Sequence, residues 1–202
     1  MLSNIIVHLG LCVALALSAA STPAGSSLTK RHVLTCLDPT NAPIIQQGYL
    51  DAKAMSAFST AYISARGTSD PLFTQYFKTN TATAVQAVFN AIALDNSVQG
   101  LGCPASCPSG SGVAVTDAAG DIDFCPSFYT FASTNAICTS SSSTLPLVRA
   151  GQVIAQLSKV LSNVGSKAGS CGDSAALSAA DSLQNRASFS CFAVSVYKAT
   201  QC

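Results

Sequence analysis

The stretch that decides the fold is residues 41–67, NAPIIQQGYLDAKAMSAFSTAYISARG. Asn41 is a residue type that caps helices, Pro43 suits a first helical turn, and Gly67 ends the run. Large apolar residues recur near the spacing of one helical face: Ile44, Met55, Phe58 and Tyr62. The stretch predicts one long helix over about residues 42–66.

Shorter helical segments follow this first helix. Asp70 and Pro71 are typical of the cap and first residue of a helix, here over residues 72–78, and Asn80 or Thr81 begins another. The second of these helices carries one apolar stripe: Val85, Val88, Phe89 and Ile92. That stripe predicts a face turned toward a core.

The middle of the chain changes character. Residues 100–112 are rich in Gly, Pro and Ser and cannot form a long helix. Residues 113–115 and 122–124 are short apolar runs separated by the turn-rich segment 116–121. This pattern predicts a small β-hairpin.

The C-terminal part is again helical. Apolar positions step by three, four and seven residues from about Leu145 and predict a helix that ends at Gly165: Leu147, Ile154, Leu157, Leu161 and Val164. Residues 174–182 and 185–198 predict two more helical segments. The fold class is therefore mainly α with a small β-hairpin or sheet element.

The first residues are typical of export. An apolar core ending at Leu17 and small residues up to Ala20 predict a signal peptide over residues 1–20. Lys30-Arg31 is a dibasic pair, so we expect a short pro-segment over residues 21–31 with cleavage there, followed by a single domain over residues 32–202. No later stretch is apolar enough to span a bilayer, which predicts a secreted, extracellular protein with no membrane partner.

Cysteine usage agrees with export. Cys12 leaves with the signal peptide, and eight cysteines remain in the expected mature chain. An even number in an oxidising compartment predicts four disulfides. The alternative is a zinc site that uses Cys103 and Cys107, whose spacing alone permits it.

Charge and composition exclude several functions. The chain has 10 Lys and Arg against 9 Asp, and no basic stripe that would bind a nucleic acid backbone. It contains no Glu, no Trp and two His, one of which, His8, lies in the signal peptide. A catalytic site with a histidine base would therefore have to use His32, which lies at the expected mature terminus.

Three groups of residues resemble parts of a chemical site, and each lacks a residue or a context that such a site needs. A terminal His32 could offer its amine and imidazole to copper, but the mature chain has no second histidine to complete such a site. Ser170 and Cys171 beside Asp173 lack the context of a nucleophile elbow. Three aspartates around Gly120 are typical of turn chemistry and lack the glutamate of a calcium loop: Asp117, Asp121 and Asp123.

Two segments carry a resemblance to a known family. LFTQYFKT at residues 72–79 and FCPSFYT at residues 124–130, together with the order of the cysteines, resemble the deuterolysin (aspzincin) family of fungal secreted zinc endopeptidases. The resemblance covers most of the mature chain and implies a zincin-like deuterolysin scaffold. It also implies the disulfide pairs Cys36–Cys103, Cys107–Cys125 and Cys138–Cys202, leaving Cys171–Cys191.

The resemblance also implies where a zinc site would lie. The family's His-Glu-x-x-His helix corresponds here to residues 153–159, so that Ala155, Gln156 and Lys159 take the positions of the first histidine, the glutamate and the second histidine. Alanine offers no ligand, glutamine cannot take a proton, and lysine brings a positive charge. Asp173 is a weak candidate for the family's third ligand and His32 a weak candidate for another metal. We therefore expect no catalytic residue and no cofactor.

These observations lead to a functional hypothesis. The chain is predicted to be a catalytically inactive deuterolysin-like protein, a pseudoenzyme that acts as a fungal effector or decoy by binding an extracellular protein or glycan, in the cell wall or the host apoplast. We expect a monomer. The alternatives are a structural protein of the cell surface, suggested by the thinly charged composition, or residual metallopeptidase or copper activity.

Overall fold

The protein is described by a computed structural model that covers residues 33–97, 99–139 and 148–202. The predicted signal peptide (1–20), the pro-segment (21–31) and the expected mature terminus His32 lie outside these residues. These three features therefore stay predictions.

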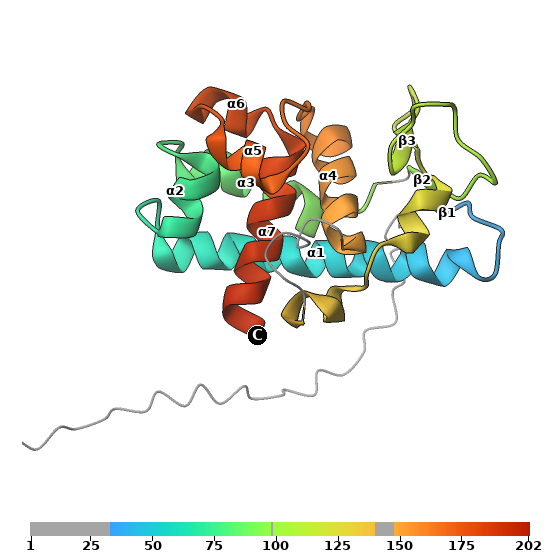
Figure 1. The fold of residues 1–202 in the computed structure, drawn as a ribbon, viewed down its shortest axis with the longest axis horizontal. Helices are drawn as coiled ribbons and strands as arrows, with labels where there is room; N and C mark the ends of the chain where they lie inside the picture. The colour runs from blue at the N-terminus through green and yellow to red at the C-terminus, as the bar shows by residue number, and fades with distance from the viewer. Residues whose placement is uncertain (1–32, 98, 140–147) are drawn as a thin grey trace, which may run out of the picture.

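The long first helix is α1, Asn41–Arg66, which lies along one side of the molecule (Figure 1). The expected length is confirmed, but the expected cap is wrong. The Asp38 carboxylate, not the side chain of Asn41, accepts hydrogen bonds from the Thr40 and Asn41 N–H groups, at 2.8 and 3.2 Å. At the other end Gly67 adopts φ 75°, a left-handed value that glycine tolerates without strain.

Helices α2 (Pro71–Phe77) and α3 (Ala82–Ala93) follow as predicted. The Asp70 carboxylate caps α2 and the Thr81 hydroxyl caps α3, so each helix starts where a side chain accepts its free N–H groups. Their apolar faces meet the last helix in a cluster of buried rings whose centroids lie 5.0 to 6.3 Å apart: Phe73, Phe77, Phe89, Phe189 and Phe192.

The small sheet has four strands in the order β1-β2-β4-β3. The predicted hairpin is present as β3 (Ala114–Thr116) antiparallel to β4 (Ile122–Phe124). Strands β1 (Val33–Leu34) and β2 (Gly100–Gly102) add parallel to it and were not predicted. Strand β3 is the antiparallel edge. Two 3₁₀ helices follow: η1 (Pro126–Thr130) and η2 (Thr134–Cys138).

The C-terminal helices differ from the prediction at their ends. Helix α4 is Arg149–Ser162, and it stops before Gly165 because Asn163 takes the left-handed conformation at φ 52°. The segment 174–182 is not one helix: α5 (Cys171–Ala176) and α6 (Ala179–Leu183) are separated at Ser178, whose hydroxyl caps α6. Helix α7 is Arg186–Gln201.

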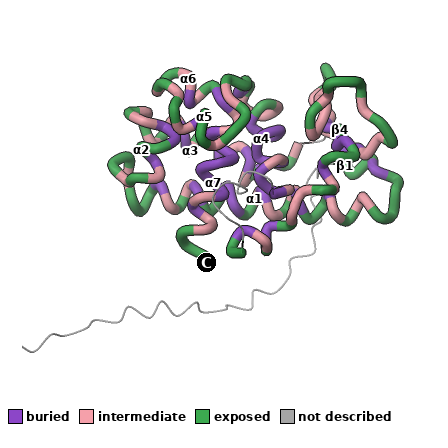
Figure 2. The backbone as a smooth tube through the Cα atoms, viewed as in Figure 1, coloured by how far each residue is buried: buried purple, intermediate pink, exposed green. Residues whose placement is uncertain are grey.

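The core lies where α1, α3, α4 and α7 meet, with the sheet at one end of this helical layer (Figures 1 and 2). Four disulfides close the structure, and their pairs are those that the resemblance implies: Cys36–Cys103, Cys107–Cys125, Cys138–Cys202 and Cys171–Cys191. The fold is thus mainly helical, with a small sheet and four disulfides. Within the described ranges, no helix has the length and apolarity to cross a membrane.

Candidate functional site

A cleft of about 210 Å³ lies between α4, the first turns of α7, strand β3 and the segment that joins α4 to α5. Helix α4 lines it with Gln152, Ala155 and Gln156, and α7 with Arg186, Ala187, Ser190 and Cys191. The remaining lining comes from Gly112–Ala114 beside the sheet and from Ser166, Ala168 and Gly169.

The cleft face of α4 follows from helical spacing. Val153, Ile154 and Leu157 are fully buried in the core and fix the orientation of the helix. Residues three and four apart lie on one face, so Gln152, Ala155 and Gln156 share the face toward the cleft.

The structure brings together two of the three positions assigned to a lost zinc site. Ala155 and Gln156 line the cleft and are 8 % and 4 % exposed. Lys159 is exposed to solvent and does not line it. The residue that shares the cleft with Gln156 at a spacing of four is Gln152, one turn earlier.

Gln156 meets a cation from the opposite helix. Nη1 of Arg186 donates a long hydrogen bond of 3.4 Å to Oε1 of Gln156. A guanidinium group has only donors, so the amide oxygen accepts from it and the hydrogens of the amide nitrogen remain for another acceptor. Arg186 is the one charged side chain in the lining that the described residues provide.

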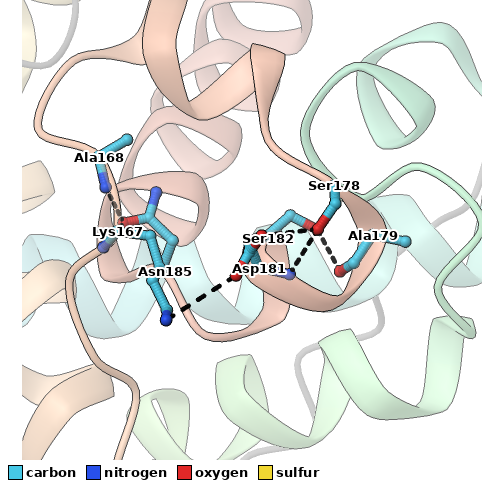
Figure 3. A network of polar contacts seen from close by, with 7 residues as sticks. All are labelled: Lys167, Ala168, Ser178, Ala179, Asp181, Ser182 and Asn185. Atoms are coloured by element: carbon cyan, nitrogen blue, oxygen red, sulfur yellow. Dashed lines mark hydrogen bonds and ion pairs between the residues drawn. The ribbon is translucent and has the colours of Figure 1, made fainter.

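Asn185 fixes the wall of the cleft opposite α4 (Figure 3). Its fully buried side chain accepts hydrogen bonds of 3.0 Å from the Lys167 and Ala168 N–H groups. Its Nδ2 donates to the hydroxyls of Ser174 and Ser188, at 3.0 and 3.1 Å. The segment beside the cleft is therefore tied to both α5 and α7.

Two further links hold the same wall. The Lys167 ammonium lies 3.8 Å from the Asp181 carboxylate, which also accepts a hydrogen bond from the Ser178 hydroxyl (Figure 3). The Cys171–Cys191 disulfide joins α5 to α7, and Cys191 itself lines the cleft. These covalent and polar links hold the wall together with Val164, which is buried in the core.

The weak metal candidates lie elsewhere. Asp173 is exposed in the first turn of α5, where its carboxylate accepts from the Ser170 hydroxyl at 2.7 Å, and it does not line the cleft. His32 lies outside the described residues. Over those residues, no three His, Cys, Asp or Glu side chains come together as a metal site.

Asp117 and Asp121 form the predicted turn around Gly120, and Asp123 lies in β4. Oδ1 of Asp117 accepts from the Ala119 and Asp121 N–H groups at 2.9 Å each, and Asp121 in turn accepts from the Gly100 N–H. These carboxylates satisfy backbone donors that join the hairpin to β2.

Perturbed titratable groups lie away from the cleft. Burial raises the pKa of Tyr129 to about 12, and the nearby Asp38 charge acts in the same direction. Burial also raises the pKa of Tyr49 and of Tyr62, which donate hydrogen bonds to Asp95 and Asp70 respectively. None of the three lines the cleft, so these shifts belong to contacts that hold the fold together.

Sequence patterns did not indicate Arg186 or Ser190 as cleft residues. The two lie at the start of a predicted helix, and nothing in its apolar pattern indicates that its first turns face α4 across thirty residues of chain. The available signal was the helical spacing of Gln152 and Gln156, two long polar side chains one turn apart with only Val153, Ile154 and Ala155 between them.

Comparison with known proteins identifies the fold. No protein-family model matches the chain, and no curated protein matches it by sequence. Among solved structures it is similar to a zinc peptidase from Grifola frondosa, with a TM-score of 0.57, 14 % sequence identity, and coverage of 74 % of this chain and 94 % of that chain. At this identity the likeness shows a shared fold.

Proposed function

We propose that this chain is an extracellular binding protein on a zinc-peptidase fold, without peptidase activity. The observation that carries the proposal is the contact between Gln156 and Arg186 in the cleft. Gln156 cannot act as a base, and the positive charge of Arg186 lies 3.4 Å from its amide oxygen. A hydrolytic zinc site would need metal ligands and a carboxylate base at these positions.

The donor set of the cleft does not fit zinc. Zinc is held by thiolate, imidazole and carboxylate groups. The described lining offers amides, hydroxyls and one guanidinium, and its one cysteine, Cys191, is committed to a disulfide. A guanidinium also repels a divalent cation, so the electrostatics oppose metal binding as the ligand chemistry does.

Strand β3 supports a binding role. It is the edge of the sheet, and its partner β4 occupies one side only. The N–H of Cys125 donates to the oxygen of Val113, and the N–H of Asp117 to the oxygen of Asp121, which places residues 113, 115 and 117 in the hydrogen-bonded register. The backbone groups of Ala114 and Thr116 therefore point to the open edge, where an extended peptide can add.

The extracellular setting is supported by four disulfides in one chain, which persist in oxidising compartments. A stapled scaffold that keeps its cleft but lacks the chemistry suits a protein that meets a partner outside the cell. An effector or decoy toward a host or other extracellular protein is the role we propose.

The test is elemental analysis for zinc and copper on the purified mature protein, followed by a casein assay with added zinc. We expect no stoichiometric metal and no hydrolysis that a chelator abolishes. One bound zinc per chain together with chelator-sensitive hydrolysis would overturn the proposal. A variant with both Gln152→His and Gln156→His is the control, since imidazoles four apart on this face should raise zinc uptake and prove the assay sensitive.

A further inference from the structure

The cleft holds buried polar groups that lack acceptors. Gln156 is 4 % exposed, and with its oxygen toward Arg186 its Nε2 has no hydrogen-bond partner among the described residues. Ser190 is also 4 % exposed, and its hydroxyl has none either within that part of the chain. Neither atom is among the unpartnered polar atoms sealed from solvent, so both open on the cleft.

Buried polar groups without partners are costly, by about 1–3 kcal/mol each, unless water or a ligand satisfies them. Here the three side chains that meet in the cleft are an amide N–H₂, a hydroxyl and a guanidinium, all able to donate. They come from two helices, α4 and α7, and all three residues line the same cleft.

The charge of the cleft has one sign. Arg186 has no ion pair with a carboxylate in the described residues, and none of the described lining residues is acidic. Arg186 and Ala187 also begin α7, a helix of sixteen residues, and the positive end of the helix dipole lies there. An anion with several acceptor oxygens matches this set.

We propose that the cleft binds a carboxylate, with Arg186 and the Gln156 amide nitrogen as its main donors and the Ser190 hydroxyl as a third. The proposal rests on the metal-free cleft proposed above. A carboxylate accepts from a guanidinium and from an amide in its own plane, and charge-assisted bonds of this kind are about twice as strong as neutral ones.

Two sources could supply this group: a free small acid or the terminal carboxylate of a peptide. The volume of about 210 Å³ is smaller than that of a typical drug-sized pocket and suits one terminal residue. Ala114 lines the same cleft from the open edge of β3, so a peptide could pair with the strand and place its last residue among the donors.

The experiment is calorimetric titration of the mature protein with acetyl-tetra-alanine bearing a free terminal acid, with the same peptide as its terminal amide, and with acetate. Binding of the peptide acid at least tenfold tighter than that of the amide supports the proposal and assigns a peptide terminus. If acetate binds as tightly as the peptide acid, the result supports the proposal and assigns a small acid as the ligand. Equal binding of acid and amide, or binding of none, overturns it.

Single substitutions test each proposed donor, and a control substitution outside the cleft tests for an effect on the fold. Arg186→Ala should weaken the peptide acid at least tenfold, and Arg186→Lys should restore part of the loss because it keeps the charge without the planar fork. Ser190→Ala tests the third donor with little change in volume. Lys159→Ala, which removes a cation of α4 that lies outside the cleft, should change nothing, and an equal loss in that variant would overturn the assignment.

The outcome is separable from that of the proposed function. Stoichiometric zinc together with chelator-sensitive hydrolysis overturns the non-catalytic proposal before any peptide is added. If the protein is metal-free and keeps its thermal unfolding midpoint, but binds the peptide acid and the peptide amide equally, only the proposed carboxylate site is overturned.

Discussion

Asn185 connects three segments with one buried side chain. Both ends of its amide are used, by two backbone N–H groups of the cleft wall and by two serine hydroxyls on α5 and α7. An amide suits this place because it accepts on one side and donates on the other, which a carboxylate cannot do. The shape of the cleft therefore depends on one residue that does not line it.

Replacing this amide should destabilise the protein. We expect Asn185→Ala to lower the free energy of unfolding by about 2–3 kcal/mol, because the two serine hydroxyls are buried and lose a donor while the wall loses its anchor. Urea denaturation followed by circular dichroism measures the change. Gln184→Ala is the control, since that neighbouring side chain is exposed and should cost less than about 0.5 kcal/mol. Equal effects in the two variants would contradict the role of Asn185.

At the scale of elements, the close approach of α4 and α7 sets the cleft. Gly151 is the point of contact: a Cβ added there would lie 3.0 Å from the Ser190 oxygen and 3.3 Å from a methyl carbon of Val194. A side chain at this position would push the two helices apart and displace one of the proposed donors.

A matched pair of glycines tests this contact. Gly48 of α1 is also buried, but a Cβ there would meet its neighbours at 3.4 Å or more, an ordinary contact. Both substitutions to alanine gain helix propensity, up to about 1 kcal/mol. We expect Gly48→Ala to leave the unfolding free energy unchanged or raised, and Gly151→Ala to lower it by about 1 kcal/mol. Chemical denaturation compares them, and a Gly151→Ala protein as stable as Gly48→Ala would show that the helices adjust freely.

The elements with strong local signals were predictable. Periodicity and capping residues indicated α1, α2, α3 and the hairpin, because those features act within a few residues of chain. The ends of α4 and the division of 174–182 were not, since Asn163 in a left-handed conformation and the Ser178 cap compete with continued helix. Strands β1 and β2 are two and three residues long and exist only through pairing with distant segments.

The cleft residues of α4 were indicated only in part. The resemblance assigned Ala155, Gln156 and Lys159 to a lost zinc site; Ala155 and Gln156 line the cleft, whereas Lys159 lies outside it. Arg186 reaches Gln156 only because α7 packs on α4, a contact between segments thirty residues apart. A pattern within one segment cannot indicate which residue of another will face it.

Across the whole molecule, tyrosine hydroxyls join layers that disulfides do not. Tyr49 of α1 reaches Asp95 beyond α3, and Tyr62 of α1 reaches the cap residue Asp70 of α2. Tyr129 of η1 packs against the core. Each of these phenols has a raised pKa because burial and a nearby carboxylate disfavour the phenolate.

These shifts predict a loss of stability at alkaline pH. In the unfolded chain a phenol titrates near pH 10, whereas Tyr129 titrates at about 12 in the fold. Between these values the native state holds protons that the unfolded state releases, so stability is full below about pH 10 and falls as pH rises toward 12. Phenolate absorbance at 295 nm, followed in native protein and in urea, should show the native transition at higher pH. Tyr129→Phe should make the fall in unfolding free energy between about pH 10 and 12 less steep, and coincident native and unfolded titrations would contradict the assignment.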